Sequence, residues 1–190
     1  MADTLLQKVG NGTLFNLSWL AIVTTGSVTI AAAVVTLHLI VHQFWLGHGR
    51  RELLFIAAVS LFGLALDQLL FALGLFTLDG KAALAPLWLT CLWPVLATTL
   101  QHAFAGLQQH LLLAGVLGGI GGYGSYLAGT KLSAVTFADP ALGPFIVGAI
   151  WVLLFPALAL AARYWFSDVS RGNGSQQDEN SDDKGEPQPA

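Results

Sequence analysis

The stretch "SLFGLALDQLLFALGLF", Ser60 to Phe76, is almost entirely apolar, yet it contains an aspartate, Asp67. The whole chain has the same character: 55% of its 190 residues are hydrophobic and 10% are charged. Soluble domains carry roughly 25% charged residues. The mean hydropathy is +0.67. Several continuous apolar runs reach the roughly 20 residues that a helix needs to cross a bilayer. The sequence therefore predicts an all-α fold, a polytopic bundle of about six transmembrane helices.

The 33 residues from Leu14 to Leu46 are nearly free of charge. One helix of that length would be about 50 Å long at about 1.5 Å per residue, too long for an upright span. We interpret "TTGS" (Thr24 to Ser27) as a break between two helices, with a single span as the alternative. The predicted transmembrane domain covers residues 1–166. Its spans are about 11–26, 28–46, 53–76, 86–104, 110–128 and 143–165.

Lysine and arginine indicate the orientation, because they gather on the cytoplasmic side of membrane proteins. With six spans and a cytoplasmic N-terminus, six of these residues lie inside and two, Lys81 and Lys131, lie outside. Both termini are therefore predicted to be cytoplasmic. Residues 167–190 hold six acidic and two basic residues and almost no apolar ones. We expect them to form a disordered acidic tail.

Asp67 lies on a stripe of small residues with Ser60, Gly63 and Gly74, because the spacings of 3, 4 and 7 share one helical face. A charged aspartate at this depth costs roughly 2.5–3.5 kcal/mol, so the stripe should face other helices. His38 and Tyr123 are partners at a similar depth, and the three form a candidate intramembrane polar site. Asp67 either binds a proton or solute or fixes helix packing.

His38 and His42 are four residues apart in "HLIVH", a spacing that can bind a metal. A third ligand would be His48 or Glu52, but both lie past the end of the predicted helix. Ordinary interfacial histidines are the favoured interpretation. We predict no metal, no cofactor and no catalytic residue.

The run "TTLQHAFAGLQQH" (Thr98 to His110) is the densest polar cluster near the membrane. It supplies a candidate cytoplasmic-side polar cluster of Gln101, His102, Gln109 and His110. These side chains either line a cavity or are ordinary interfacial residues.

Glycines at offsets of 0, 3, 4, 7 and 14 form one face of the fifth span. Such faces let helix backbones approach closely. A broken helix that lines a substrate site is the alternative. The predicted helix-packing glycines are Gly115, Gly118, Gly119, Gly122 and Gly129.

The runs "PLWLTCLWPVLATTLQHAF" and "GVLGGIGGYGSYLAGTKLSA" resemble the family catalogued as domain of unknown function 2878. The resemblance extends over about residues 12–160. It implies a small multi-pass inner-membrane protein of a bacterium, with no established activity. The association of such proteins with genes for lipid modification is a hint of a lipid-related role.

Three functions remain open at the level of the sequence. The first is a membrane scaffold or helper linked to lipid metabolism, and the second is a small-solute or proton-coupled transporter centred on Asp67. The third is an intramembrane enzyme acting on lipid. Expected partners are the lipid bilayer and a second copy or another membrane protein. No basic patch points to nucleic acid.

Overall fold

The computed structural model describes residues 3–47 and 49–182, and over these residues the chain is mainly helical. In chain order the elements are α1 (Leu5–Thr25), α2 (Val28–Trp45), α3 (Arg50–Ala72), β1 (Phe76–Leu78), α4 (Leu87–Thr90), α5 (Leu92–Leu100), the 3-10 helix η1 (Ala105–Gln109), α6 (Leu111–Leu132), β2 (Val135–Phe137) and α7 (Gly143–Asp182). The predicted all-α fold is confirmed.

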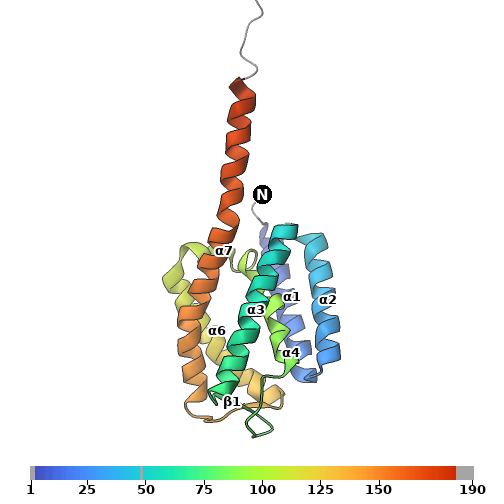
Figure 1. The fold of residues 1–190 in the computed structure, drawn as a ribbon, viewed down its shortest axis with the longest axis vertical. Coiled ribbons are helices and arrows are strands. Elements are labelled where there is room, and N and C mark those ends of the chain that lie inside the picture. Colours follow the sequence, from blue (N-terminus) through green and yellow to red (C-terminus); the bar gives the residue numbers. More distant parts are fainter. Residues whose placement is uncertain (1–2, 48, 183–190) are drawn as a thin grey trace, which may run out of the picture.

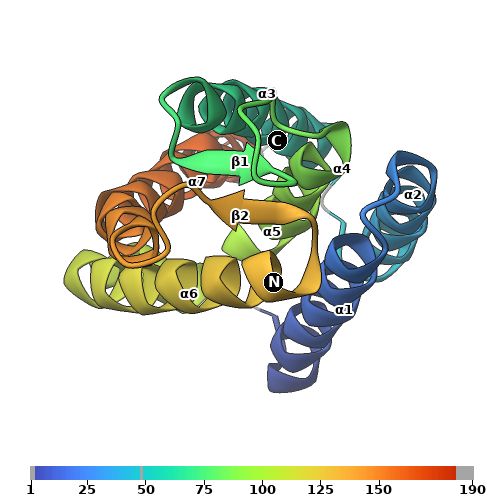
Figure 2. The ribbon, with the colours of Figure 1, turned by 90° about the horizontal axis from the view of Figure 1, so that it is seen from below.

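Successive long helices run in opposite directions along the bundle (Figure 1). One end holds the start of α1, the α2–α3 connection and the α5–α6 connection, and we call it the terminal end. The opposite end holds the α1–α2 turn and the two strands, and we call it the strand end. Seen from below, β1 and β2 lie across the centre of the bundle, while α1 and α2 stand to one side (Figure 2).

Four helical stretches among the described residues are long and apolar enough to cross a membrane. They are Val28–Trp45, Arg50–Ala72, Leu111–Leu132 and Gly143–Ser167. Leu87–Leu100 is apolar but shorter, and α1 is not one of the four. Large apolar side chains such as Leu61 and Leu153 are exposed on the outside of the bundle. In water such a surface would be unfavourable, so the structure is that of a membrane-embedded protein.

The apolar run from Leu14 to Leu46 forms two helices, α1 and α2. The break falls at Gly26, whose φ of 56° is the left-handed conformation that glycine adopts without strain. Ser27 then caps α2, because its hydroxyl accepts a hydrogen bond from the Ile30 amide at 3.4 Å.

The two short strands were not predicted. β1 and β2 pair in antiparallel register, with Phe76 opposite Phe137. The hydroxyl groups of Thr77 and Thr136 are 2.8 Å apart. Phe76 lies at the end of the predicted third span, but α3 stops at Ala72 because the chain turns at Gly74, whose φ is 73°.

The predicted fourth span consists of two shorter helices, α4 and α5. Pro86 is the N-cap of α4, and the helix is interrupted at Cys91. Pro94 explains the interruption, because proline has no N–H to donate to the carbonyl group of Thr90. α5 then ends at Leu100, so His102 lies in the turn that follows.

Four of the five predicted packing glycines lie against α7. A Cβ atom at Gly115 would lie 3.0 Å from the Val152 carbonyl oxygen, and one at Gly118 would lie 2.8 Å from that of Trp151. Gly119 and Gly122 likewise contact α7 side chains. Gly129 differs: no atom lies within 4 Å of its Cβ position.

α7 continues to Asp182 and projects beyond the terminal end of the bundle (Figure 1). Its backbone therefore runs past residue 165, the predicted end of the sixth span. Residues 183–190 lie outside the described residues. The acidic tail over residues 167–190 stays a prediction.

Candidate functional site

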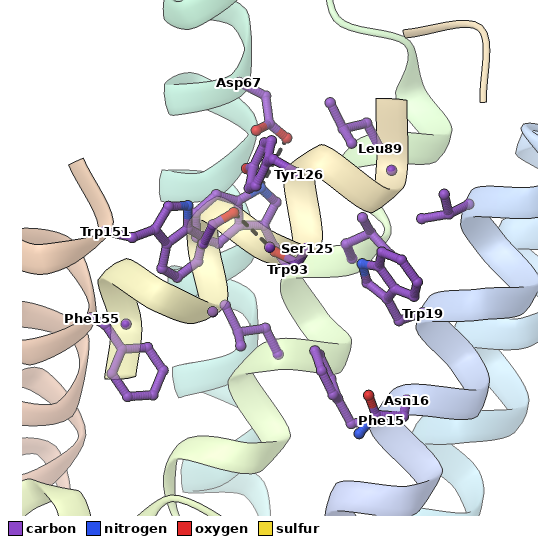
Figure 3. Close-up of a pocket in the computed structure, with 18 of the residues that line it drawn as sticks. Phe15, Asn16, Trp19, Asp67, Leu89, Trp93, Ser125, Tyr126, Trp151 and Phe155 are labelled. Atoms are coloured by element: carbon purple, nitrogen blue, oxygen red, sulfur yellow. Dashed lines mark hydrogen bonds between the residues drawn. The ribbon is translucent and has the colours of Figure 1, made fainter. Parts of the chain in front are cut away.

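A cavity of about 680 Å³ lies inside the bundle. Its walls come mainly from α1, α4, α5 and α6, and α3, η1, α7 and the two strands contribute further residues. Most of the lining is aromatic or aliphatic, including Phe15, Trp19, Leu92 and Phe155 (Figure 3). The volume falls within the roughly 300–1,000 Å³ typical of small-molecule sites.

Asp67 lies in the wall of this cavity and is 2% exposed. Its Oδ2 atom accepts a hydrogen bond of 2.9 Å from the indole N–H of Trp93. Gly63, one turn earlier on α3, leaves room for the Trp93 ring, because any Cβ there would overlap it. That hydrogen bond is the only one that the carboxyl group makes with the described residues, so its second oxygen is available to a ligand.

Aromatic rings surround this carboxyl group. Trp93 stacks on Trp151 with ring centroids 5.9 Å apart, and Tyr126 lies 6.3 Å from Trp151. Figure 3 shows Asp67, Trp93 and Tyr126 together at one end of the cavity. The aromatic pairs fix the orientation of Trp93 and thereby that of its hydrogen bond to Asp67.

Three other polar side chains of the cavity wall bond to carbonyl groups of their own helices. Ser125 donates to the Gly122 carbonyl group, Thr130 to that of Leu127, and Asn16 to that of Gly12. These groups are therefore already paired. Among the described residues that line the cavity, Asp67 supplies the single carboxyl group.

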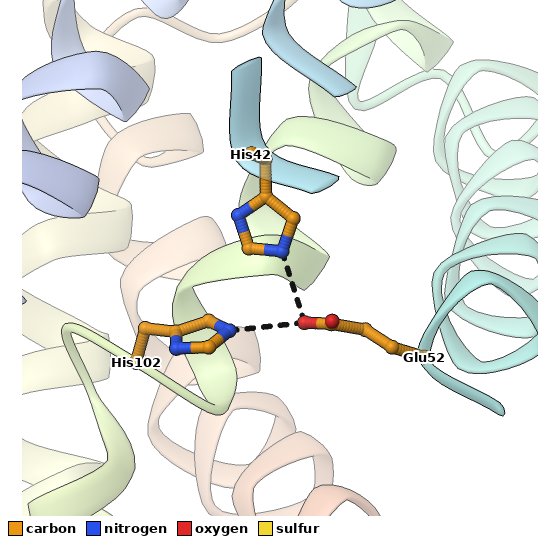
Figure 4. A group of neighbouring side chains, drawn as sticks. All are labelled: His42, Glu52 and His102. Carbon is orange, nitrogen blue, oxygen red and sulfur yellow. Dashed lines mark hydrogen bonds and ion pairs between the residues drawn. The ribbon is translucent and has the colours of Figure 1, made fainter. Parts of the chain in front are cut away.

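A second polar site lies at the terminal end, where His42, Glu52 and His102 converge (Figure 4). The Oε1 atom of Glu52 lies 2.9 Å from Nε2 of His42 and 3.0 Å from Nε2 of His102. The three residues are between 0% and 1% exposed. One ligand atom from each lies within 4.8 Å of the others.

Local structure brings these three side chains together. His42 is in the last turn of α2, and Glu52 is in the first turn of α3. The short connection between these helices folds the chain back, so the two residues meet although they are ten positions apart. His102 arrives from the turn after α5.

Further polar groups contact the other ring nitrogen, Nδ1, of each histidine. Nδ1 of His102 lies 2.7 Å from Oδ2 of Asp3, and the amide nitrogen of Asn11 lies 3.5 Å from Nδ1 of His42. Burial alone lowers the pKa of His102, but its hydrogen bonds to Glu52 and Asp3 outweigh burial and raise the pKa above its ordinary value.

The structure does not bring the predicted intramembrane group together. Asp67 pairs with Trp93, whereas His38 bonds Ser18 at 2.9 Å and Thr98 at 3.0 Å. Tyr123 packs on Phe145, with ring centroids 5.2 Å apart. The tyrosine beside Asp67 is Tyr126, so depth alone did not identify the partner.

The predicted cytoplasmic-side cluster also separates. Gln101 donates to the Ala162 carbonyl group, whereas Gln109 and His110 are exposed. Of the four residues, His102 alone belongs to the buried cluster with Glu52.

Sequence reasoning identified part of the terminal-end cluster. It named His38 and His42, with His48 or Glu52 as the third ligand, as an alternative metal set, but discounted His48 and Glu52 because both lie past the helix end. His38 is not part of the cluster, because it bonds Ser18 and Thr98 instead. His48 lies outside the described residues. Asp3 and Asn11 had no sequence signal, because they are ordinary polar residues near the start of the chain.

Comparison with known protein families matches residues 8–157, which is most of the chain. The comparisons with curated proteins and with solved structures gave no match. The family match carries no activity, so the site geometry remains the basis for assigning one. The chain belongs to the family described as "Protein of unknown function (DUF2878)".

Proposed function

We propose that this protein binds an apolar membrane molecule, such as a lipid or another long-chain hydrocarbon, in the cavity between α1, α5 and α6. In this proposal it acts in a bacterial inner membrane as a lipid-binding helper rather than as an enzyme. The observation that carries the proposal is the cavity itself: about 680 Å³, mostly apolar, with one carboxyl group in its wall.

The character of the walls favours a hydrocarbon chain over a small polar solute. Aromatic and aliphatic side chains dominate, and Ser125 and Thr130 already bond to helix carbonyl groups. A polar solute would lose its hydrogen bonds to water and find few in the cavity to replace them. A hydrocarbon chain makes no such hydrogen bonds and therefore loses none. This argues against a polar transport path through the cavity.

Asp67 gives the cavity a polar end. Its Oδ2 atom is fixed by Trp93, and its second oxygen is available to a hydroxyl or amine group on the ligand. A few placed polar groups within an apolar pocket fix the orientation of a ligand. The proposed ligand therefore has a long apolar part and a head group that donates a hydrogen bond.

The test is to identify what co-purifies with the full chain. The protein is purified in mild detergent and washed, and its bound lipids are quantified by native mass spectrometry and by solvent extraction. We expect about one retained molecule for each protein chain. Absence of any retained long-chain molecule would overturn the proposal.

A matched pair of variants tests whether the lipid binds in the cavity. Gly124 lines the cavity, and no atom lies within 4 Å of its Cβ position, so Gly124→Leu adds its side chain to free space. Ala33→Leu adds bulk on the exposed surface of α2. We expect Gly124→Leu to lose most of the bound molecule and Ala33→Leu to retain it. Equal retention would place the lipid elsewhere.

A proton-coupled carrier centred on Asp67 makes a different prediction. Liposomes containing the protein would then show a proton flux that Asp67→Asn abolishes. If the protein binds lipid as proposed, we expect no proton flux from the parent or from Asp67→Asn. We expect Asp67→Asn to change which head groups are retained.

A further inference from the structure

We propose that His42, Glu52 and His102 bind one divalent transition-metal ion at the terminal end of the bundle. This site is separate from the cavity, because none of the three residues lines it. The proposal does not rest on the proposed lipid binding.

The nitrogen atoms of two histidines converge on one carboxylate oxygen. Nε2 of His42 and Nε2 of His102 both approach the same oxygen, Oε1 of Glu52, at 2.9 and 3.0 Å. Without a metal each Nε2 donates its proton to Oε1, and a metal ion displaces these protons and takes up the lone pairs that they leave. A cation placed among them is coordinated by all three atoms at once.

The His102 ring is held in the orientation of a metal ligand. Asp3 accepts the Nδ1–H of His102 at 2.7 Å, which leaves Nε2 of that ring to face the shared point. A histidine that ligates a metal typically donates its other ring N–H to a carboxylate in this manner. At His42 the Asn11 amide nitrogen donates to Nδ1 at 3.5 Å while its oxygen accepts from the Ala103 amide, so a metal at Nε2 requires the ring proton to move to Nδ1 and the Asn11 amide to turn.

The inclination of the two rings and the separations of the ligand atoms suit a single bound ion. The planes of the His42 and His102 rings are inclined by 71°, with centroids 5.0 Å apart, so the two rings approach from different directions. Ligand atoms bound at about 2.0–2.2 Å around a tetrahedral centre lie a little over 3 Å apart. The present separations of 2.9 and 3.0 Å to Oε1 need only a slight widening to admit an ion.

Burial supports the same conclusion. The three side chains are nearly inaccessible, and a buried carboxylate is retained where it is paired or coordinates a metal.

The ligand set identifies the class of metal. Two imidazole nitrogens and one carboxylate oxygen suit zinc and divalent iron rather than calcium or magnesium, which take oxygen ligands. The three ligands found among the described residues leave a fourth coordination position for water, another small ligand or a further protein residue.

The test uses the full chain in detergent, carrying a purification tag without histidines. After dialysis against a chelator, zinc is titrated by calorimetry, and the bound metal is counted by elemental analysis. We expect one zinc ion for each chain. Substoichiometric binding by the parent protein, or zinc removed by a simple wash, would be adventitious and would overturn the proposal.

Substitutions distinguish the three proposed ligands from a buried histidine outside the site. His42→Gln, Glu52→Gln and His102→Gln should each weaken zinc binding at least tenfold. His38→Gln is the matched control, because it is a buried histidine one turn from His42 whose partners are Ser18 and Thr98. It should bind zinc as the parent does. An equal loss in His38→Gln, or parent-like binding in His42→Gln, would contradict the assignment.

Asp3→Asn tests the outer partner. Loss of such a partner typically weakens metal binding about 10–100-fold, whereas a surface ion would not respond to it. Parent-like zinc affinity in Asp3→Asn would show that Asp3 does not support a metal ligand and would count against the site.

Two measurements on the parent alone keep the proposal falsifiable if a ligand variant does not fold. Bound zinc should raise the thermal unfolding temperature, because it binds the folded chain. Cobalt in its place should give the intense visible absorption of four-coordinate Co²⁺. An unchanged unfolding temperature, or the weak spectrum of six-coordinate cobalt, would overturn the site. Neither readout requires a bound lipid, so failure of the lipid proposal stays distinguishable.

Discussion

The Asp67 carboxyl group and the Trp93 indole form a buried polar pair between α3 and α5. We predict that Asp67→Leu destabilises the protein by about 1–3 kcal/mol, because it leaves a buried N–H without an acceptor. Asp67→Asn keeps an acceptor oxygen and should unfold within a few degrees of the parent. Thermal unfolding in detergent, followed by tryptophan fluorescence, measures both.

The asparagine variant serves as the control for the leucine variant, since it has nearly the same shape as aspartate. Equal unfolding temperatures for the two variants would show that the hydrogen bond to Trp93 contributes little. A large loss in both would mean that the ionisable carboxyl group itself holds the bundle together.

The sequence predicts the environment of Asp67 better than it predicts its partner. Gly63 and Asp67 on one helical face indicated an inward-facing stripe, and Gly63 does contact the Trp93 ring. The partner is 26 residues away on another helix, and no spacing rule connects the two. Depth in the membrane favoured His38 and Tyr123, but several residues share one depth.

At the scale of elements, α6 and α7 are held together by glycines that admit α7 side chains. A Cβ atom at Gly118 would overlap Phe155 and lie 2.8 Å from the Trp151 carbonyl oxygen. We predict that Gly118→Ala costs about 1–3 kcal/mol through overpacking. Gly121→Ala meets no atom within 4 Å and should stabilise the helix by about 0.5–1 kcal/mol.

These two substitutions make the same chemical change three residues apart on one helix. Unfolding temperatures measured side by side therefore isolate the contact with α7 from helix propensity. The same direction of shift in both variants would mean that the packing of α6 on α7 does not limit stability.

The helices were predictable because apolar runs of about 20 residues have few alternatives in a membrane. The break near Gly26 was predictable too, since glycine and serine end one helix and cap the next. β1 and β2 were not, because three-residue strands in separate loops give no periodic signal. The cluster of Glu52 with His102 depends on contact between α3 and the turn after α5, which brings together residues 50 positions apart.

At the scale of the whole molecule, charge and fold indicate one orientation. Arg50 and Arg51 begin α3 at the terminal end, whereas Lys81 follows β1 at the strand end. Basic residues collect on the cytoplasmic side, so we propose that the terminal end is cytoplasmic. The site formed by His42, Glu52 and His102 would then face the cytoplasm.

Cysteine labelling tests this orientation. Cys91 is the single cysteine of the chain, so Cys91→Ser provides an unlabelled background. Ala82→Cys places a thiol at the exposed strand end, and Gln109→Cys places one at the exposed terminal end. In intact cells a membrane-impermeant maleimide should label Ala82→Cys and not Gln109→Cys. After permeabilisation it should label both, because the barrier is then gone. The reverse pattern would show that the protein has the opposite orientation in the membrane. Equal labelling of both variants in intact cells would mean that the charge difference does not fix a single orientation.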